Sequence, residues 1–217
     1  MSYSVFLAKI LPQKYMSDFL DGNLHMNTDD FFTEIESSDV LRLDIYEGAD
    51  EARQFKQISI KSSSGEWVPI KGAKSPLIYR YREKDVRHIL CMHMFTDRPD
   101  FCFDHRNIGF GDTAILITDL KEFLKRVKAA AAAEGKHLFH GPVEYVDKKF
   151  HDGQMGPFRK FSEYEYQSEF RLVMVGTQNE PNKPTKLSVG NIRDIVMVSG
   201  SDQLPSLRKV KEDAGHQ

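Results

Sequence analysis

The sequence predicts a mixed α+β domain, built on an antiparallel or mixed sheet with a peripheral hairpin insertion. Short apolar segments of strand length recur from one end of the chain to the other. One long amphipathic helix is predicted at residues 119–134. Strands outnumber the helices that could connect them as crossovers, which disfavours a doubly wound parallel sheet.

The N-terminal residues predict a strand, a helix, a second strand and a second helix in quick succession. The first strand is Val5–Leu11, and residues 13–21 read as about two helical turns, with Tyr15 and Phe19 on one face. Residues 24–27 form the next extended piece. Thr28 then begins a helix with acidic residues in its first turn, where they favour the helix dipole.

The next part of the chain, residues 39–76, is polar and is expected to be a peripheral insertion. Residues 62–65, Ser-Ser-Ser-Gly, predict a turn between two short strands at 55–60 and 66–70. We therefore expect a hairpin at the periphery of the domain.

After residue 78 the sequence again predicts elements of the hydrophobic core. The apolar density of residues 87–95 predicts a central strand, and residues 113–118 predict another. Asp119 is expected to cap the long helix, whose alanine run has high helix propensity and which Gly135 ends. The remaining strands are predicted at residues 141–146, 170–175 and 192–198.

Composition indicates one globular domain over residues 1–202, followed by a polar C-terminal tail at 203–217. The 217 residues are 40% hydrophobic, and the net charge of −2 disfavours a general polyanion binder. Two cysteines are too few for a disulfide framework. No apolar run has membrane-spanning length, so we expect a cytoplasmic protein without a membrane partner.

Residues 164–174, Tyr-Glu-Tyr-Gln-Ser-Glu-Phe-Arg-Leu-Val-Met, carry the main candidate site. A charged cluster runs directly into a buried strand, so Gln167 and Glu169 are expected on one face near its start. A carboxylate held in position by a rigid strand can act as a catalytic group. The alternative is that Glu169 and Arg171 form a solvated charge ladder.

A second candidate is a zinc site made of Cys91, His93, Cys102 and His105. Two thiols and two imidazoles are a chemically suitable ligand set. However, no Cys-x-x-Cys turn holds them, so buried cysteines and surface histidines are the alternative. A third candidate face places Arg42, Asp44 and Tyr46 together on one strand, where a salt-bridged strand is the alternative.

The N-terminal pattern resembles the opening of the ADP-ribosyltransferase fold, particularly its bacterial toxin members. The features are a basic residue, Lys9, on the first strand, a helix ending Phe-Leu-Asp-Gly, the segment Asn-Leu-His-Met-Asn, and a late Gln-x-Glu at Gln167 and Glu169. Residues 87–175 also resemble an uncharacterised bacterial and phage family with a late Glu-x-Glu-x-Arg. The family's basic residue is here a lysine, and Cys91-Met92-His93 stands in place of its middle motif.

The resemblance implies an NAD-dependent enzyme that transfers ADP-ribose to a protein or nucleic acid, in conflict between phages and their hosts. Glu169 would stabilise the cation formed at the ribose, and Gln167 would orient the acceptor. NAD would be the substrate and would lie against Lys9 and His93. An aromatic residue, Tyr15 or Tyr46, would stack on nicotinamide.

Two other function classes stay open. A phage-type protein without enzyme activity would bind a host protein or single-stranded nucleic acid through a basic and aromatic run. That run consists of Tyr79, Arg80, Tyr81, Arg82, Lys84 and Arg87. A metal-dependent hydrolase would use the Cys91, His93, Cys102 and His105 set.

Overall fold

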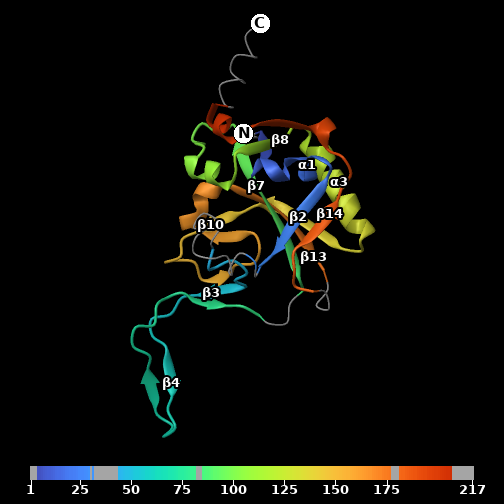
Figure 1. The fold of residues 1–217 in the computed structure, drawn as a ribbon. Helices are drawn as coiled ribbons and strands as arrows, with labels where there is room; N and C mark the ends of the chain where they lie inside the picture. Colours follow the sequence, from blue (N-terminus) through green and yellow to red (C-terminus); the bar gives the residue numbers. More distant parts are fainter. Residues whose placement is uncertain (1–3, 30, 32–43, 82–84, 177–180, 207–217) are drawn as a thin grey trace.

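The structure, a computed structural model, describes residues 4–29, 31, 44–81, 85–176 and 181–206. It is a mixed α+β fold with mostly antiparallel sheets and few helices, as the sequence predicts (Figure 1). The main sheet has eight strands. They are β1 (Val5–Leu11), β2 (Asn23–Thr28), β7 (Arg87–Thr96), β8 (Thr113–Ile117), β9 (His137–Pro142), β13 (Glu169–Val175), β14 (Thr185–Ser188) and β15 (Val196–Gly200).

The long strand β7 organises this sheet. One of its edges pairs with β13, which in turn pairs with β9. The other edge is shared by two strands: β2 pairs with His88 and Ile89, and β1 pairs with residues 93–96. From there β1 leads on to β8 and β15, while β2 leads on to β14. The sheet therefore splits along β7, and residues 90–92 lie where β1 and β2 diverge.

One face of the sheet packs against α1 (Met16–Leu20) and α3 (Leu120–Ala133). Asp119 caps α3 by accepting a hydrogen bond from the Glu122 amide, as the sequence predicts. Phe123, Val127 and Ala131 recur every four residues and are fully buried. This periodicity fixes the helix against the apolar side of β7 and β13.

The opposite face of the sheet carries polar side chains. Along β13 the side chains alternate, so that Phe170, Leu172 and Met174 join the α3 core while Glu169 and Arg171 lie on the other side. That side is covered by the helical turns η2 (His105–Phe110) and η3 (Ser162–Gln167), the parallel pair β10 (Glu144–Val146) and β12 (Arg159–Phe161), and residues 44–53.

The predicted insertion divides into two parts. Within residues 39–76, Asp44, Glu47 and Ala52 are buried, because they pack beneath β13 and β12. β3 (Glu51–Arg53) pairs with β6 (Leu77–Tyr79) and β11 (Gly153–Gln154). Beyond them, the hairpin of β4 (Ser59–Lys61) and β5 (Trp67–Pro69) extends away from the body (Figure 1). The expectation of a peripheral segment is therefore wrong for Asp44 and Glu47.

The short elements near the two ends of the described chain differ in part from those that the sequence predicts. Residues 13–21 form a 3₁₀ turn, η1 (Gln13–Tyr15), followed by α1. Most of the helix predicted after Thr28 lies outside the described residues. Near the C-terminus, η4 (Arg193–Ile195) precedes β15, and η5 (Ser201–Ser206) buries Leu204. The rest of the predicted tail, 207–217, lies outside the described residues. No helix in the described part of the chain is long and apolar enough to cross a bilayer.

Candidate functional site

A pocket of about 820 Å³ opens where β1 and β2 diverge from β7. Its wall combines apolar residues of β7 with polar and basic residues of the neighbouring elements. The residues that matter for its chemistry are Lys9, Tyr15, His93, Lys160, Gln167 and Glu169. Two of its four lysines, Lys160 and Lys186, form ion pairs with the two carboxylates of the wall, Glu169 and Asp18. Lys9 and Lys14 add positive charge, so the pocket favours an anionic ligand.

Lys9 lies at the point of divergence. Its Nζ donates a hydrogen bond of 2.8 Å to the carbonyl oxygen of Cys91, on the stretch of β7 between its contacts with β1 and β2. Neither β1 nor β2 pairs with Cys91, so the lysine supplies the hydrogen-bond donor that this backbone carbonyl needs. The bond also fixes the ammonium group at the pocket wall.

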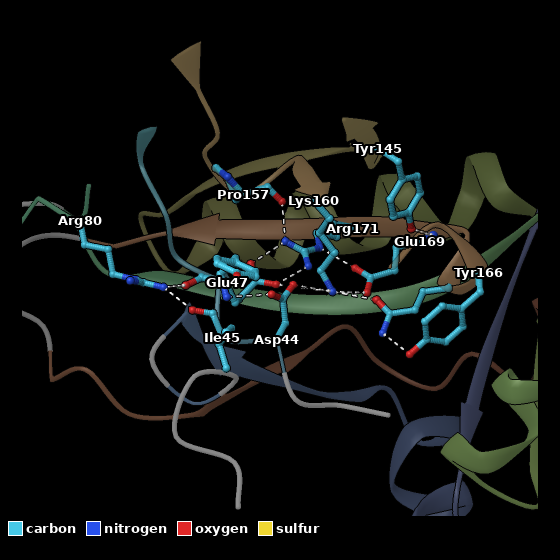
Figure 2. Close-up of polar contacts among 12 residues, drawn as sticks. Asp44, Ile45, Glu47, Arg80, Tyr145, Pro157, Lys160, Tyr166, Glu169 and Arg171 are labelled. Atoms are coloured by element: carbon cyan, nitrogen blue, oxygen red, sulfur yellow. Dashed lines mark hydrogen bonds and ion pairs between the residues drawn. The ribbon is translucent and has the colours of Figure 1, made fainter. Parts of the chain in front are cut away.

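Glu169 lies at the start of β13, where two cations hold its carboxylate (Figure 2). Its Oε1 accepts a 2.8 Å hydrogen bond from Lys160 Nζ, and its Oε2 accepts a 2.7 Å hydrogen bond from Arg171 Nε. The carboxylate also lines the pocket. The solvated charge ladder expected for Glu169 and Arg171 is wrong, because Arg171 is fully buried and Glu169 is 8% exposed.

Two carboxylates from the segment before β3 complete the charge network (Figure 2). Glu47 accepts two hydrogen bonds from the Arg171 guanidinium, at 2.8 and 2.6 Å, and this bidentate geometry is the strong form of the pair. Asp44 Oδ2 lies 3.4 Å from Lys160 Nζ. The network thus contains three carboxylates and two cations, all of them buried.

The burial and the charges of the network determine the pKa values of its carboxylates. Burial opposes the ionisation of Glu169, but the charges of Arg171 and Lys160 outweigh it and hold its pKa well below the usual range. The pKa of Glu47 is also lowered, since Arg171 and Lys160 again outweigh its burial. The pKa of Asp44 is raised, because its burial outweighs the attraction of Lys160. Glu169 therefore remains a carboxylate across the physiological pH range.

Gln167 also contacts Lys160, although it precedes β13 in the chain and does not belong to that strand. The sequence placed Gln167 and Glu169 two apart on one face, but Gln167 ends η3, and Ser168 between them adopts a left-handed conformation with φ of 42°. The expected strand geometry is therefore wrong. The two side chains nevertheless converge, because Lys160 Nζ also donates a 2.8 Å hydrogen bond to Gln167 Oε1.

His93 is buried beside the pocket in its neutral form. Its Nδ1 lies 2.8 Å from the carbonyl oxygen of Gln167, which can only accept, so Nδ1 carries the proton. Nε2 is buried with no hydrogen-bond partner, and the ring packs edge-on against Phe95 and Phe103. Burial lowers the pKa of His93 to about 4.

This histidine predicts an acid-sensitive component of stability. Because the pKa falls from about 6.5 in the unfolded chain to about 4 in the folded one, the unfolded chain binds more protons between these values. Stability is therefore lost as the pH falls through this window. At about 1.4 kcal/mol per pH unit, His93 accounts for about 2 kcal/mol between pH 7 and 5.

Urea unfolding at pH 7 and pH 5 measures this loss in the natural chain and in His93→Gln. Glutamine retains a donor for the Gln167 carbonyl but does not titrate. We expect the variant to lose about 2 kcal/mol less than the natural chain between the two pH values. Equal losses in the two proteins would show that His93 is not the responsible group.

Two other predictions for site residues, the stacking role of Tyr46 and the zinc set, do not agree with the positions of the side chains. Tyr46 does not line it, because its ring packs edge-on against Phe161 and its hydroxyl accepts a hydrogen bond from Lys148. Tyr15, in contrast, lines the pocket and is half exposed.

In the described part of the chain, no three His, Cys, Asp or Glu side chains are placed to hold a metal ion, so the zinc set is wrong. The half-buried Cys91 thiol has its pKa raised to about 12 by burial and by Glu169.

The basic and aromatic run around residue 80 is committed to internal contacts. Arg87 forms ion pairs with Asp29 and Asp50, at 2.6 and 3.2 Å. Arg80 donates to the carbonyl oxygen of Ile45 at 2.6 Å (Figure 2), and the Tyr81 hydroxyl donates to Glu51. Arg82 and Lys84 lie outside the described residues. The described part of this run therefore offers little free charge to a nucleic acid.

Sequence reasoning identified Glu169 but missed the residues that hold it. Lys160 and Glu47 lie 9 and 122 positions away from Glu169 in the chain, and no periodicity in the sequence marks either as buried. Comparison with models of protein families, with curated proteins and with solved structures finds no match to this chain.

Proposed function

We propose that the chain is an NAD-dependent ADP-ribosyltransferase-like enzyme and that the pocket between β1 and β2 binds NAD. One observation carries the proposal. Lys9, His93 and Glu169 come from three neighbouring strands, β1, β7 and β13, and line one pocket. His93 lies in register with Glu169 on one side and with Ala8, the neighbour of Lys9, on the other. The three positions that the resemblance singled out thus line the same pocket.

The composition of the pocket supports a dinucleotide ligand. NAD carries a pyrophosphate, and Lys9 and Lys14 supply positive charge along the wall, where Lys186 is paired with Asp18. A lysine binds phosphate as a point charge, without the bidentate fork of an arginine. Tyr15 and Phe110 offer aromatic surface for the flat rings of the ligand. The finer fold, an ADP-ribosyltransferase-like sheet, is part of the same proposal.

Glu169 performs the chemical step in this proposal. The bond between nicotinamide and the ribose C1 breaks, both electrons leave with neutral nicotinamide, and the ribose becomes an oxocarbenium cation. The acceptor then bonds to C1 and loses a proton. A carboxylate that is ionised before the reaction stabilises this charge without reorganisation. Each Glu169 oxygen accepts one hydrogen bond within the network, and a carboxylate has about four acceptor sites, so capacity remains for a ribose hydroxyl.

In this proposal Gln167 orients the acceptor. Its side chain and that of Glu169 both accept a hydrogen bond from Lys160 Nζ, which supports this role. The acceptor in this proposal is a protein or a nucleic acid, and the biological setting is conflict between bacteria and phages. His93 acts as a positioning residue through its bond to the Gln167 carbonyl.

Calorimetric titration with NAD tests the binding part of this proposal. Replacing Lys9 by Gln removes the pocket's charge at the divergence of β1 and β2 while keeping a donor for the Cys91 carbonyl. Because a hydrogen bond to a charged group contributes about 1.5–3 kcal/mol, we expect NAD affinity to fall by about tenfold or more. The matched control is Lys121→Gln, on the exposed surface of α3, which should bind NAD as the natural chain does. Failure of the natural chain to bind NAD would remove the proposal.

A further inference from the structure

The hairpin of β4 and β5 presents an apolar face to solvent, away from the body of the protein. Ile60 lies opposite Val68 in its register, and the Ile70 amide donates a 2.8 Å bond to the Ile58 carbonyl, which extends the ladder by one pair. Because side chains alternate along a strand, Ile58, Ile60, Val68 and Ile70 share one face. Ile60, Val68 and Ile70 are 60%, 46% and 46% exposed. The opposite face carries Trp67, at 69% exposed.

This arrangement is costly for a ribbon of two strands. A two-stranded hairpin by itself is marginally stable in water, and it needs its apolar face covered. The root of the arm is nevertheless fixed to the body. Gln54 Nε2 donates to the carbonyl oxygens of Lys148 and His151 at 2.8 and 2.9 Å, and Ser75 Oγ donates to Gln54 Oε1 at 2.6 Å. A fixed root therefore presents the four β-branched side chains at a defined place outside the body.

We propose that residues 57–71 form a dimerisation arm and that the occupant of the apolar face is the same arm of a second copy of the chain. The two ribbons pack face to face, antiparallel, about a two-fold axis. A two-fold interface brings the same patch from each subunit together, and a stripe of β-branched residues is complementary to itself in such packing.

The charges on the arm select this orientation. The end near the body carries Lys56, Lys71 and Lys74. Beside the turn at the tip, Glu66 lies opposite Ser62 on the apolar face, whereas Lys61 lies opposite Trp67 on the other face. Antiparallel packing places the Glu66 of each arm near the base lysines of the other arm. Parallel packing would instead bring the lysines of both copies together, which costs free energy.

Two other partners fit the arm less well. A hairpin that enters a bilayer would need an apolar tip, but the turn here is Ser62-Ser63-Ser64-Gly65, followed by Glu66. A nucleic acid would engage the lysines and Trp67, yet it would leave the aliphatic face exposed. A second copy covers that face and also brings the Glu66 of each arm toward the base lysines of the other arm.

Light scattering coupled to gel filtration, over a range of protein concentrations, tests the proposal. We expect the natural chain to be a dimer and the double variant Ile60→Ser with Val68→Ser to dissociate at least tenfold more readily. The control is Trp67→Ser, on the other face of the same ribbon, which should leave the dimer unchanged. Circular dichroism establishes that the body of each variant is folded.

Three results would overturn the proposal. One is a natural chain that remains monomeric throughout the concentration range. Another is a dimer that the double serine variant does not weaken. The third is equal weakening by Trp67→Ser, which would assign the contact to the opposite face. As a further check on orientation, Glu66→Lys should weaken the dimer more at low salt than at high salt, because the lost attraction is electrostatic.

Discussion

Replacing Glu169 by Gln is expected to reduce nicotinamide release from NAD by at least about 100-fold per folded molecule, a loss typical of removing one group that stabilises transition-state charge. The variant loses the carboxylate that lines the pocket but keeps its shape. The measurement is the initial rate of nicotinamide release, divided by the folded fraction that urea unfolding gives for the same sample.

Glu169 also belongs to a buried ion network, so its loss is expected to destabilise the fold as well as the reaction. The matched control is Glu47→Gln. Glu47 pairs with the same guanidinium through both of its oxygens, but it does not line the pocket. We expect Glu47→Gln to be destabilised by a similar amount and to retain most of the rate per folded molecule. Equal loss of rate per folded molecule in the two variants would mean that the loss comes from disturbing the shared ion network and not from a direct role of Glu169 in the reaction.

The second large effect is on stability. Replacing Arg171 by Met removes one of the two buried cations that hold Glu47 and Glu169, and removing one partner of a buried ion pair costs about 3–5 kcal/mol. We expect a loss of this size in the free energy of unfolding, measured by urea at pH 7. Methionine is of similar length and apolar, so the loss arises from the charge and its hydrogen bonds and less from an empty volume.

The comparison is with Arg126→Met on the surface. Arg126 also forms a two-pronged ion pair, with Asp194 at 2.9 and 2.6 Å, but Asp194 is largely exposed. Exposed pairs contribute about 0–1 kcal/mol each, and this variant also loses the Arg126 pair with Glu122, so it should lose at most about 2 kcal/mol. If the two arginine variants were equally stable, the buried network would not support the fold as described.

Much of the fold could be predicted from local sequence. The strand Val5–Leu11 and the helix capped by Asp119 were predicted nearly to the residue, because their apolar periodicity and capping signals lie within the elements themselves. The hairpin with its Ser-Ser-Ser-Gly turn was predicted for the same reason. Local signals of this kind predict which elements form, but they do not predict that β1 and β2 share one edge of β7.

The candidate site was predicted less completely, since it depends on contacts between distant parts of the chain. Glu169 stood out because charged residues lead directly into an apolar strand. Glu47 appeared to belong to a peripheral segment, because nothing in its neighbourhood reveals that Arg171 would be buried 124 residues away. Tyr46 was assigned to the pocket by residue type alone, whereas the fold directs it toward Phe161. Burial of a charge can be inferred once its partner is known, and the partner comes from the tertiary fold.

The most direct test of the central claim is nicotinamide release by the natural chain, followed with NAD labelled on the adenylate and with a bacterial lysate as the source of acceptors. We expect release of nicotinamide and transfer of the label to a protein or nucleic acid. Folded protein that binds no NAD and releases no nicotinamide, with or without lysate, would contradict it.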